Sequence, residues 1–268
     1  MILRGSVPSA VLGMDTGLTV IVPGSYRDTQ DQVRQPYKVA YLLHGLYGNH
    51  QSWSDYTMLP DYASNYEIVF IMPEAGRSFY TNMTFGLDYF TYISQELPQI
   101  CKKTFFISDR REDTFIIGGS AGGYGALKCA LDQPDIFGHC MAFSSAGLFL
   151  KKDLEQLREE KAAGAEAHSR LWRDMRAVFG ENLECSLKDE LLSLADMQLK
   201  ERRNMPNIFM LCGSEDPYLE ENRWFAAEMK KRNRIPFSYQ EIPGGHDWSY
   251  FNQALQTGLQ VKYSQITG

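Results

Sequence analysis

The sequence predicts an α/β protein with a mostly parallel central sheet and helices on both faces. Short apolar runs rich in β-branched residues alternate with helical patterns from residue 37 onward, which is the order of βαβ units. The runs are apolar at successive positions, as in strands that are covered on both faces. The six runs expected to form these strands are 37–43, 67–72, 114–117, 137–143, 207–212 and 237–242.

Helices are expected between and after these strands, and two further strands before them. The helical patterns lie at 88–103, 122–131, 219–232 and 248–261. Near the N-terminus, the stretches 2–7 and 17–22 are predicted strands; a turn signal at 14–17 separates them and suits an antiparallel edge. The chain, 1–268, has an ordinary length for one α/β domain, so we expect a single domain.

The segment 146–206 differs from the rest and is predicted to be a helical insertion. From 151 to 206, 23 of 56 residues are charged, and helical patterns occupy 154–165 and 186–199. An excursion after the strand at 137–143 would lie over the carboxyl ends of the strands, where open α/β sheets bind ligands. Two interpretations remain open at this point: a cap or pocket wall, and a solvated helical hairpin.

The composition argues against nucleic acid, membranes and metals as partners. The formal charge is −6, and polyanion binding needs clustered Lys and Arg. No apolar run exceeds five residues, too few to span a bilayer, and the N-terminus lacks a signal-peptide pattern, so a cytoplasmic location is expected. The five cysteines are scattered without a C-x-x-C pair. We therefore expect buried thiols and no metal.

A glycine-rich turn, Gly118 to Gly122, follows the predicted strand at 114–117 and precedes a predicted helix. Strand, sharp turn and helix is the context of a nucleophile elbow, in which Ser120 projects from a strained turn. A side chain two residues to either side would collide there, and Gly118 and Gly122 have none. We expect Ser120 to be a catalytic nucleophile; the alternative is a turn chosen only for close helix packing.

A second glycine-containing loop, residues 44–48, comes directly after the strand that ends at Leu43. The backbone N–H groups of Leu46 and Ala121 are expected to converge on a developing oxyanion. His44 precedes the serine in the chain, which does not fit the order Ser, Asp, His. We expect His44 to brace this loop rather than to act as a base.

The general base must lie late in the chain, and His246 does, in a loop between a predicted strand and a predicted helix. Asp216 follows the strand at 207–212 and is favoured over Glu215 as the carboxylate that orients this histidine. Asp247 is adjacent to His246 and is expected to cap the following helix instead.

With these segments, the chain resembles the tributyrin esterase and feruloyl esterase group of the esterase D family, which is related to S-formylglutathione hydrolase and belongs to the α/β-hydrolase superfamily. The resemblance implies an α/β-hydrolase fold and a cofactor-free carboxylic ester hydrolase acting on small-molecule esters, frequently a homo-oligomer. It supports Ser120, Asp216 and His246 as a triad with Leu46 and Ala121 as oxyanion donors. The matching stretches are 41–53, 71–88, 89–98, 111–128 and 244–248.

The residues beside the serine depart from the family pattern. Gly119 and Ala121 stand where this family commonly has large residues, which predicts a locally wider acyl pocket. The charged insertion offers no evident apolar underside, so compact acyl groups such as acetyl, butyryl or feruloyl are expected. Candidates for the apolar lining are Trp53, Phe79, Tyr80 and Trp248.

Alternatives on the same scaffold remain open. An alcohol or thiol could accept the acyl group in place of water, which would make the chain an acyltransferase. Hydrolysis of the thioester S-formylglutathione needs the same triad. A protein of this fold that only binds ligands is disfavoured, because every residue type of the triad and both oxyanion elements are present.

Overall fold

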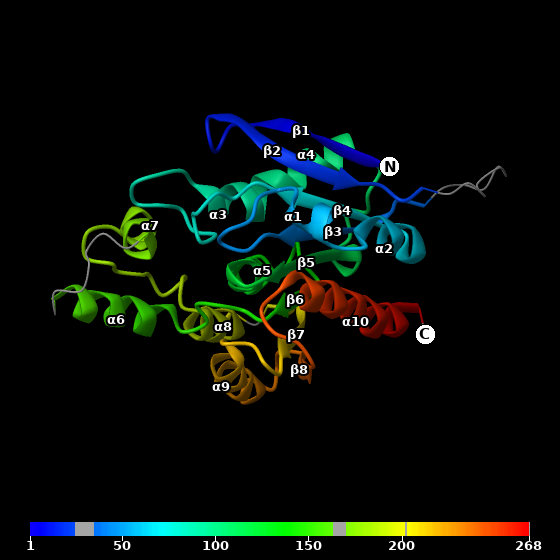
Figure 1. Cartoon of the computed structure of the whole chain (residues 1–268). Coiled ribbons are helices and arrows are strands. Elements are labelled where there is room, and N and C mark those ends of the chain that lie inside the picture. Colours follow the sequence, from blue (N-terminus) through cyan, green and yellow to red (C-terminus); the bar gives the residue numbers. More distant parts are fainter. Residues whose placement is uncertain (25–34, 163–169, 202, 268) are drawn as a thin grey trace.

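The structure is a computed structural model, and it describes residues 1–24, 35–162, 170–201 and 203–267. One eight-stranded sheet runs through it in the order β1-β2-β4-β3-β5-β6-β7-β8 (Figure 1). The strands are β1 (Ile2–Ser9), β2 (Met14–Ile21), β3 (Lys38–Leu43), β4 (Ile68–Pro73), β5 (Thr114–Gly119), β6 (His139–Phe143), β7 (Asn207–Gly213) and β8 (Phe237–Ile242). All eight overlap the predicted strands, but the turn expected at 14–17 is wrong: residues 10–13 form the turn, and β2 already begins at Met14, which pairs with Ser9.

The sheet is parallel from β3 to β8 and antiparallel at one edge. β2 pairs antiparallel with both β1 and β4, as expected for the N-terminal pair. The other neighbours pair in parallel. This arrangement confirms the predicted class and brings the carboxyl ends of β3, β5, β6, β7 and β8 to one edge, where loops from distant parts of the chain meet.

Two hydrophobic clusters cover the two faces of the sheet. Along β3, Val39 and Tyr41 belong to one cluster, whereas Ala40 and Leu42 belong to the other, because successive side chains of a strand point to opposite faces. One face packs against α1 (Ser52–Tyr56), α2 (Leu59–Tyr66) and α10 (Trp248–Thr267). The other packs against α3 (Tyr89–Thr91), α4 (Leu97–Thr104), α5 (Ala121–Asp132), α8 (Leu191–Lys200) and α9 (Leu219–Lys230).

The helix predicted at 88–103 contains a π-helical turn, Tyr92–Glu96, between α3 and α4. Pro98 lies two residues after this turn and has no N–H to donate to the carbonyl four residues earlier, within the turn. An interrupted ladder of helical hydrogen bonds at that point accounts for the wider turn.

The insertion between β6 and β7 is helical, as predicted. It contains α6 (Leu150–Ala162), α7 (Arg170–Phe179) and α8. α6 overlaps the pattern predicted at 154–165, of which residues 163–165 lie outside the described part. α8 overlaps the pattern predicted at 186–199 only from Leu191 onward, because residues 186–190 are not helical. α6 and α7 lie together at one side of the molecule, while α8 packs against α5 (Figure 1).

Candidate active site

Ser120 occupies the sharp turn between β5 and α5, with φ +58° and ψ −128°. This backbone conformation is strained for a residue with a side chain. A Cβ on Gly118 would lie 2.0 Å from the carbonyl oxygen of Gly122, and one on Gly122 would lie 2.3 Å from that of Leu43. Both glycines are therefore required sterically, and together they let the turn place Ser120 at the carboxyl end of a central strand.

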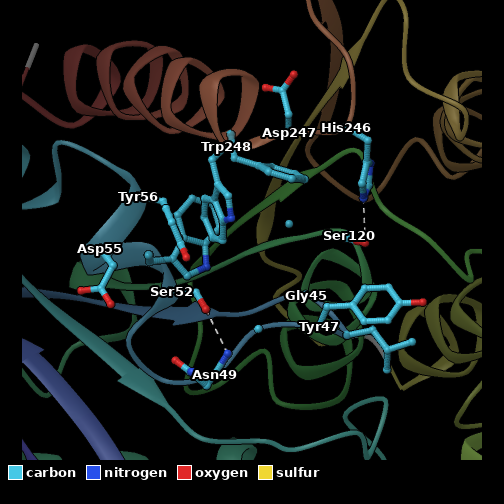
Figure 2. A pocket seen from close by; sticks show the side chains of 15 residues that line it. Gly45, Tyr47, Asn49, Ser52, Asp55, Tyr56, Ser120, His246, Asp247 and Trp248 are labelled. Atoms are coloured by element: carbon cyan, nitrogen blue, oxygen red, sulfur yellow. Dashed lines mark hydrogen bonds between the residues drawn. The ribbon is translucent and has the colours of Figure 1, made fainter.

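His246 and Asp216 form a hydrogen-bonded chain with Ser120. The Nε2 atom of His246 lies 3.0 Å from Ser120 Oγ, the contact drawn in Figure 2. Its Nδ1 atom lies 2.8 Å from Asp216 Oδ2. A proton on Nδ1 donated to Asp216 leaves Nε2 free to accept the serine proton. The structure thus brings together the three side chains that chain order selects.

Asp216 is held as a buried carboxylate. Its side chain is 0% exposed, and Oδ1 accepts the backbone N–H of Tyr218 at 2.8 Å. Burial alone would raise the pKa of Asp216, but hydrogen bonds from His246 and from Tyr218 N–H hold that pKa below its ordinary value. A charged partner for the imidazole is therefore present at neutral pH.

Asp247 plays the structural role expected of it. Its Oδ1 atom accepts the backbone N–H of Tyr250 at 2.9 Å, which caps the start of α10. Figure 2 shows its carboxylate directed away from His246 and Ser120.

The loop after β3 lies against the serine turn. Ala121 is the first residue of α5, so its N–H has no acceptor within the helix. Leu46 lines both pockets that contain Ser120. The Leu46 carbonyl accepts a hydrogen bond from Arg77 Nη1 at 3.0 Å, which fixes the loop. Leu46 and Ala121 thus line one pocket together with Ser120, and their backbone N–H groups remain the expected oxyanion donors.

His44 braces this loop, as predicted. Its Nδ1 atom lies 2.8 Å from the carbonyl oxygen of Gly45, and Nε2 accepts the N–H of Ala75 at 3.1 Å. The Tyr80 hydroxyl donates to the His44 carbonyl at 2.6 Å. Tyr80 is buried and lines neither pocket beside Ser120, so the structure places it under the loop instead of against a substrate.

A first pocket, of about 360 Å³, opens beside Ser120 and His246 and is bounded by aromatic rings (Figure 2). Trp53 is buried, donates through Nε1 to the Leu43 carbonyl at 2.9 Å, and packs edge-on against Trp248 with ring centroids 5.3 Å apart. Tyr56 stacks on Trp248 at 5.1 Å. Trp53 and Trp248 thus lie where the sequence suggested an apolar lining, in a tightly packed aromatic group.

The glycine before the serine does not widen this pocket. A Cβ on Gly119 would lie 2.8 Å from the ring of Phe251, which is itself a lining residue. The ring of Phe251 thus fills the space that a larger neighbour of the serine would need. The expectation of a pocket enlarged at Gly119 is therefore wrong.

A second pocket, of about 450 Å³, lies on the other side of Ser120 and is walled by the insertion. Its lining includes Ala121, Phe79 and Ala146 together with side chains of α6 and α7. These lining residues agree with the pocket-wall interpretation of the insertion. The apolar side chains that α6 and α7 contribute are Leu150, Leu154, Leu157, Leu171 and Met175. The expectation that this insertion lacks an apolar underside is therefore wrong.

Glu221 lines the second pocket, and its surroundings raise the pKa of its carboxyl group. Its Oε1 atom accepts the N–H of Leu148 at 2.7 Å. Burial and the nearby charge of Asp153 raise the pKa of Glu221 from 4.5 to about 7. Folding therefore favours its protonated form, and ionisation of Glu221 destabilises the native state.

We expect the free energy of unfolding to fall as the pH rises from about 5 to 8, by on the order of 2 kcal/mol more in the wild type than in Glu221→Gln. The stability that Glu221 contributes is present below its ordinary pKa and is lost as the pH passes about 7. Urea unfolding at pH 5, 6.5 and 8 measures it. Glu220→Gln, at the exposed neighbouring position, is the control; parallel profiles for wild type and Glu221→Gln would contradict this assignment.

The fold and site define a class of protein: a serine hydrolase of the α/β-hydrolase fold. Residues 9–261 match the family described as putative esterase, and the chain belongs to that family. It is a carboxylic ester hydrolase. Over the described residues, no helix is long and apolar enough to cross a membrane, and no group of three or more His, Cys, Asp or Glu could hold a metal ion.

The chain is similar to several characterised proteins over nearly its whole length. It is 28% identical to an acetyl esterase of Caldicellulosiruptor saccharolyticus over 257 residues, 94% of each chain. The substrate-bound structure of fluorophosphonate-binding serine hydrolase F from Staphylococcus aureus matches with a TM-score of 0.83 and 28% identity, covering 98% of each chain. An S-formylglutathione hydrolase from the same organism matches with a TM-score of 0.82, 28% identity and the same coverage.

Proposed function

We propose that this chain hydrolyses compact acyl esters, acetyl and butyryl above all and feruloyl as a flat variant, through an acyl-enzyme on Ser120. His246 is the proposed general base, Asp216 its orienting carboxylate, and the N–H groups of Leu46 and Ala121 the oxyanion donors. The observation that carries this proposal is the continuous chain Ser120 Oγ–His246 Nε2 (3.0 Å) and His246 Nδ1–Asp216 Oδ2 (2.8 Å) between two pockets.

In the proposed reaction, Ser120 Oγ attacks the ester carbonyl carbon while its proton passes to His246 Nε2. The carbonyl oxygen becomes an oxyanion that accepts the two backbone N–H groups, each worth about 3 kcal/mol in a preorganised site. When the C–O bond breaks, the Nε2 proton goes to the departing alcohol. Water then attacks the acyl-enzyme by the same route and releases the acid and Ser120.

Two observations support a compact acyl group. The pockets measure about 360 and 450 Å³, near the lower end of the range for ligand sites. The first is bounded by the packed rings of Trp53, Trp248 and Phe251, which a long chain could not displace without loss of core contacts. The name of the relative, acetyl esterase, agrees with this size.

We expect kcat/KM to fall at least about tenfold from p-nitrophenyl butyrate to p-nitrophenyl palmitate, since overfilling a packed pocket costs at least about 1.4 kcal/mol. Acetate is expected within about tenfold of butyrate, because a missing methylene is worth only about 1 to 3 kcal/mol in an apolar pocket. Initial rates of nitrophenol release measure the series. A palmitate value equal to or above the butyrate value would exclude the compact acyl site.

A second candidate is hydrolysis of S-formylglutathione, which the 28% identity to the staphylococcal enzyme favours. The acidic residues that line the two pockets argue the other way: these are Asp55, Asp153, Glu160 and Asp247, together with Glu221, which is partly ionised at neutral pH. Glutathione carries two carboxylates, which such a lining repels. Comparing kcat/KM for S-formylglutathione and for p-nitrophenyl acetate distinguishes a thioesterase from an esterase. Measuring the ratio of free acid to new ester in the presence of added alcohol distinguishes a hydrolase from an acyltransferase.

A further inference from the structure

The second pocket has an apolar wall that two helices of the insertion build. Leu150, Leu154 and Leu157 lie at positions i, i+4 and i+7 of α6, and so on one helix face. Leu171 and Met175 lie at i and i+4 of α7. We call these five side chains the α6–α7 wall. Of the exposed charged residues of α6, Lys151, Lys152, Arg158 and Glu159 do not line this pocket, whereas Glu160 does.

The wall changes from core to surface along its length. Leu150, Leu154 and Met175 are buried in the hydrophobic core, so they hold the insertion against the body of the protein. Leu157 is partly buried, and Leu171 is 43% exposed although it lines the pocket. Apolar surface of this kind stays in contact with water until a ligand covers it, and covering it with an apolar group is favourable.

The two pockets differ in what they can accept. The aromatic pocket is fixed by mutually packed rings, and Trp53 is anchored by its hydrogen bond to Leu43. It suits a short group of fixed size. The α6–α7 wall ends at exposed Leu171, so a longer group can lie along it and extend into solvent. Ser120 and His246 line both pockets. When the carbonyl carbon of an ester lies at Ser120, the acyl half therefore extends into one pocket and the alcohol half into the other.

We propose that the α6–α7 wall binds the alcohol half of the ester and that this half is uncharged and apolar. The inference rests on the proposed function, because a compact acyl group in the aromatic pocket leaves the wall for the other half.

The charge of this pocket supports the uncharged state. Its acidic lining residues among those described are Asp153, Glu160 and Glu221, of which Glu221, with its pKa raised to about 7, is only partly ionised at neutral pH. The nearby cation is Arg77, over the Tyr47 ring at 5.1 Å, and its Nε already donates to Asp174 at 2.7 Å. Within the part of the chain that the structure describes, an alcohol that carries a carboxylate would therefore meet acidic side chains, and the nearby Arg77 is already engaged by Asp174.

Acetate esters of methanol, butanol and hexanol test the proposal, because the acyl group stays constant. We expect the ratio of kcat/KM for hexyl to methyl acetate to exceed about tenfold in the wild type, because each methylene that the wall covers is removed from water. We expect that ratio to fall about tenfold in Leu157→Gln/Leu171→Gln. Leu171→Gln alone, at an exposed position, keeps the test valid if the double variant does not fold. Leu187→Gln is the matched control, at a 66% exposed leucine of the same insertion that lines neither pocket.

A second series separates the two halves of the ester. With p-nitrophenyl acetate and butyrate, the acyl ratio should be the same in the wild type and the wall variants; a changed acyl ratio with an unchanged alcohol ratio would overturn the assignment. Equal kcat/KM values of the wild type for the acetate esters of methanol, butanol and hexanol would also overturn it. The compact-acyl proposal is tested separately, by kcat/KM of the wild type for p-nitrophenyl palmitate relative to butyrate. For the charge, acetylated 4-hydroxybenzoate should be a poorer substrate than its methyl ester, and equal rates would remove the uncharged requirement.

Discussion

Replacing Ser120 by alanine, or His246 by alanine, is expected to lower kcat by about 10⁵- to 10⁶-fold, because a nucleophile and its base act as one unit. The geometry gives the reason. Ser120 Oγ loses its proton to a nitrogen 3.0 Å away, and removal of either atom removes the same proton transfer. The residual rate would come from the oxyanion donors and from substrate binding. Turnover of p-nitrophenyl acetate by purified variants at matched enzyme concentration measures the loss.

The double variant makes this test sharper. Ser120→Ala/His246→Ala should be no slower than either single variant by more than a few fold, because the second removal takes away nothing that still functions. Ser64→Ala, at an exposed serine of α2, should retain wild-type activity and still react with a fluorophosphonate, whereas Ser120→Ala should not be labelled. More than about a tenth of wild-type kcat in either single variant would remove the assigned pair.

The elements that the sequence predicts well are those that local sterics dictate. The serine turn needs no side chain at Gly118 or Gly122, because the nearest backbone oxygens would lie 2.0 and 2.3 Å from a Cβ. The same rule can be read from the sequence as two glycines flanking a serine after an apolar run. His246 and Asp216 follow from chain order, because the strands before them end at the same edge of a parallel sheet.

What the sequence does not predict depends on contacts between distant segments. Gly119 suggested open space, but Phe251, from the last helix, fills it. Tyr80 suggested an aromatic lining, yet its hydroxyl serves the His44 carbonyl. No local pattern discloses either contact.

The apolar wall is a different case, because a signal was present. The high charge of the insertion hides an apolar period in α6, at 150, 154 and 157, and in α7, at 171, 175 and 178. A count of charges averages over the helix circumference, whereas the pocket meets only one face. Periodicity within the charged segment was therefore the better guide to the site, and it would also have predicted α7.

Replacing Asp216 by asparagine is expected to lower kcat by about 10⁴-fold, less than removal of the nucleophile or the base. The carboxylate accepts the Nδ1 proton of His246 at 2.8 Å and so keeps Nε2 free to accept from the serine. An asparagine can present its NH₂ group to Nδ1 instead. That arrangement favours a proton on Nε2, where it faces Ser120 and blocks proton transfer. The backbone N–H of Tyr218 still finds an oxygen acceptor in the variant, so the fold should be kept.

The matched control is Glu215→Gln, because the adjacent Glu215 is exposed and is the rival carboxylate in the same loop. Asp216→Asn should also react with a fluorophosphonate far more slowly than the wild type, although Ser120 is still present, because the reagent depends on the same activated hydroxyl. Far-UV circular dichroism and thermal unfolding establish that both variants fold. If Glu215→Gln lost as much activity as Asp216→Asn, or if Asp216→Asn kept more than about a tenth of wild-type kcat, the orienting role would not belong to Asp216.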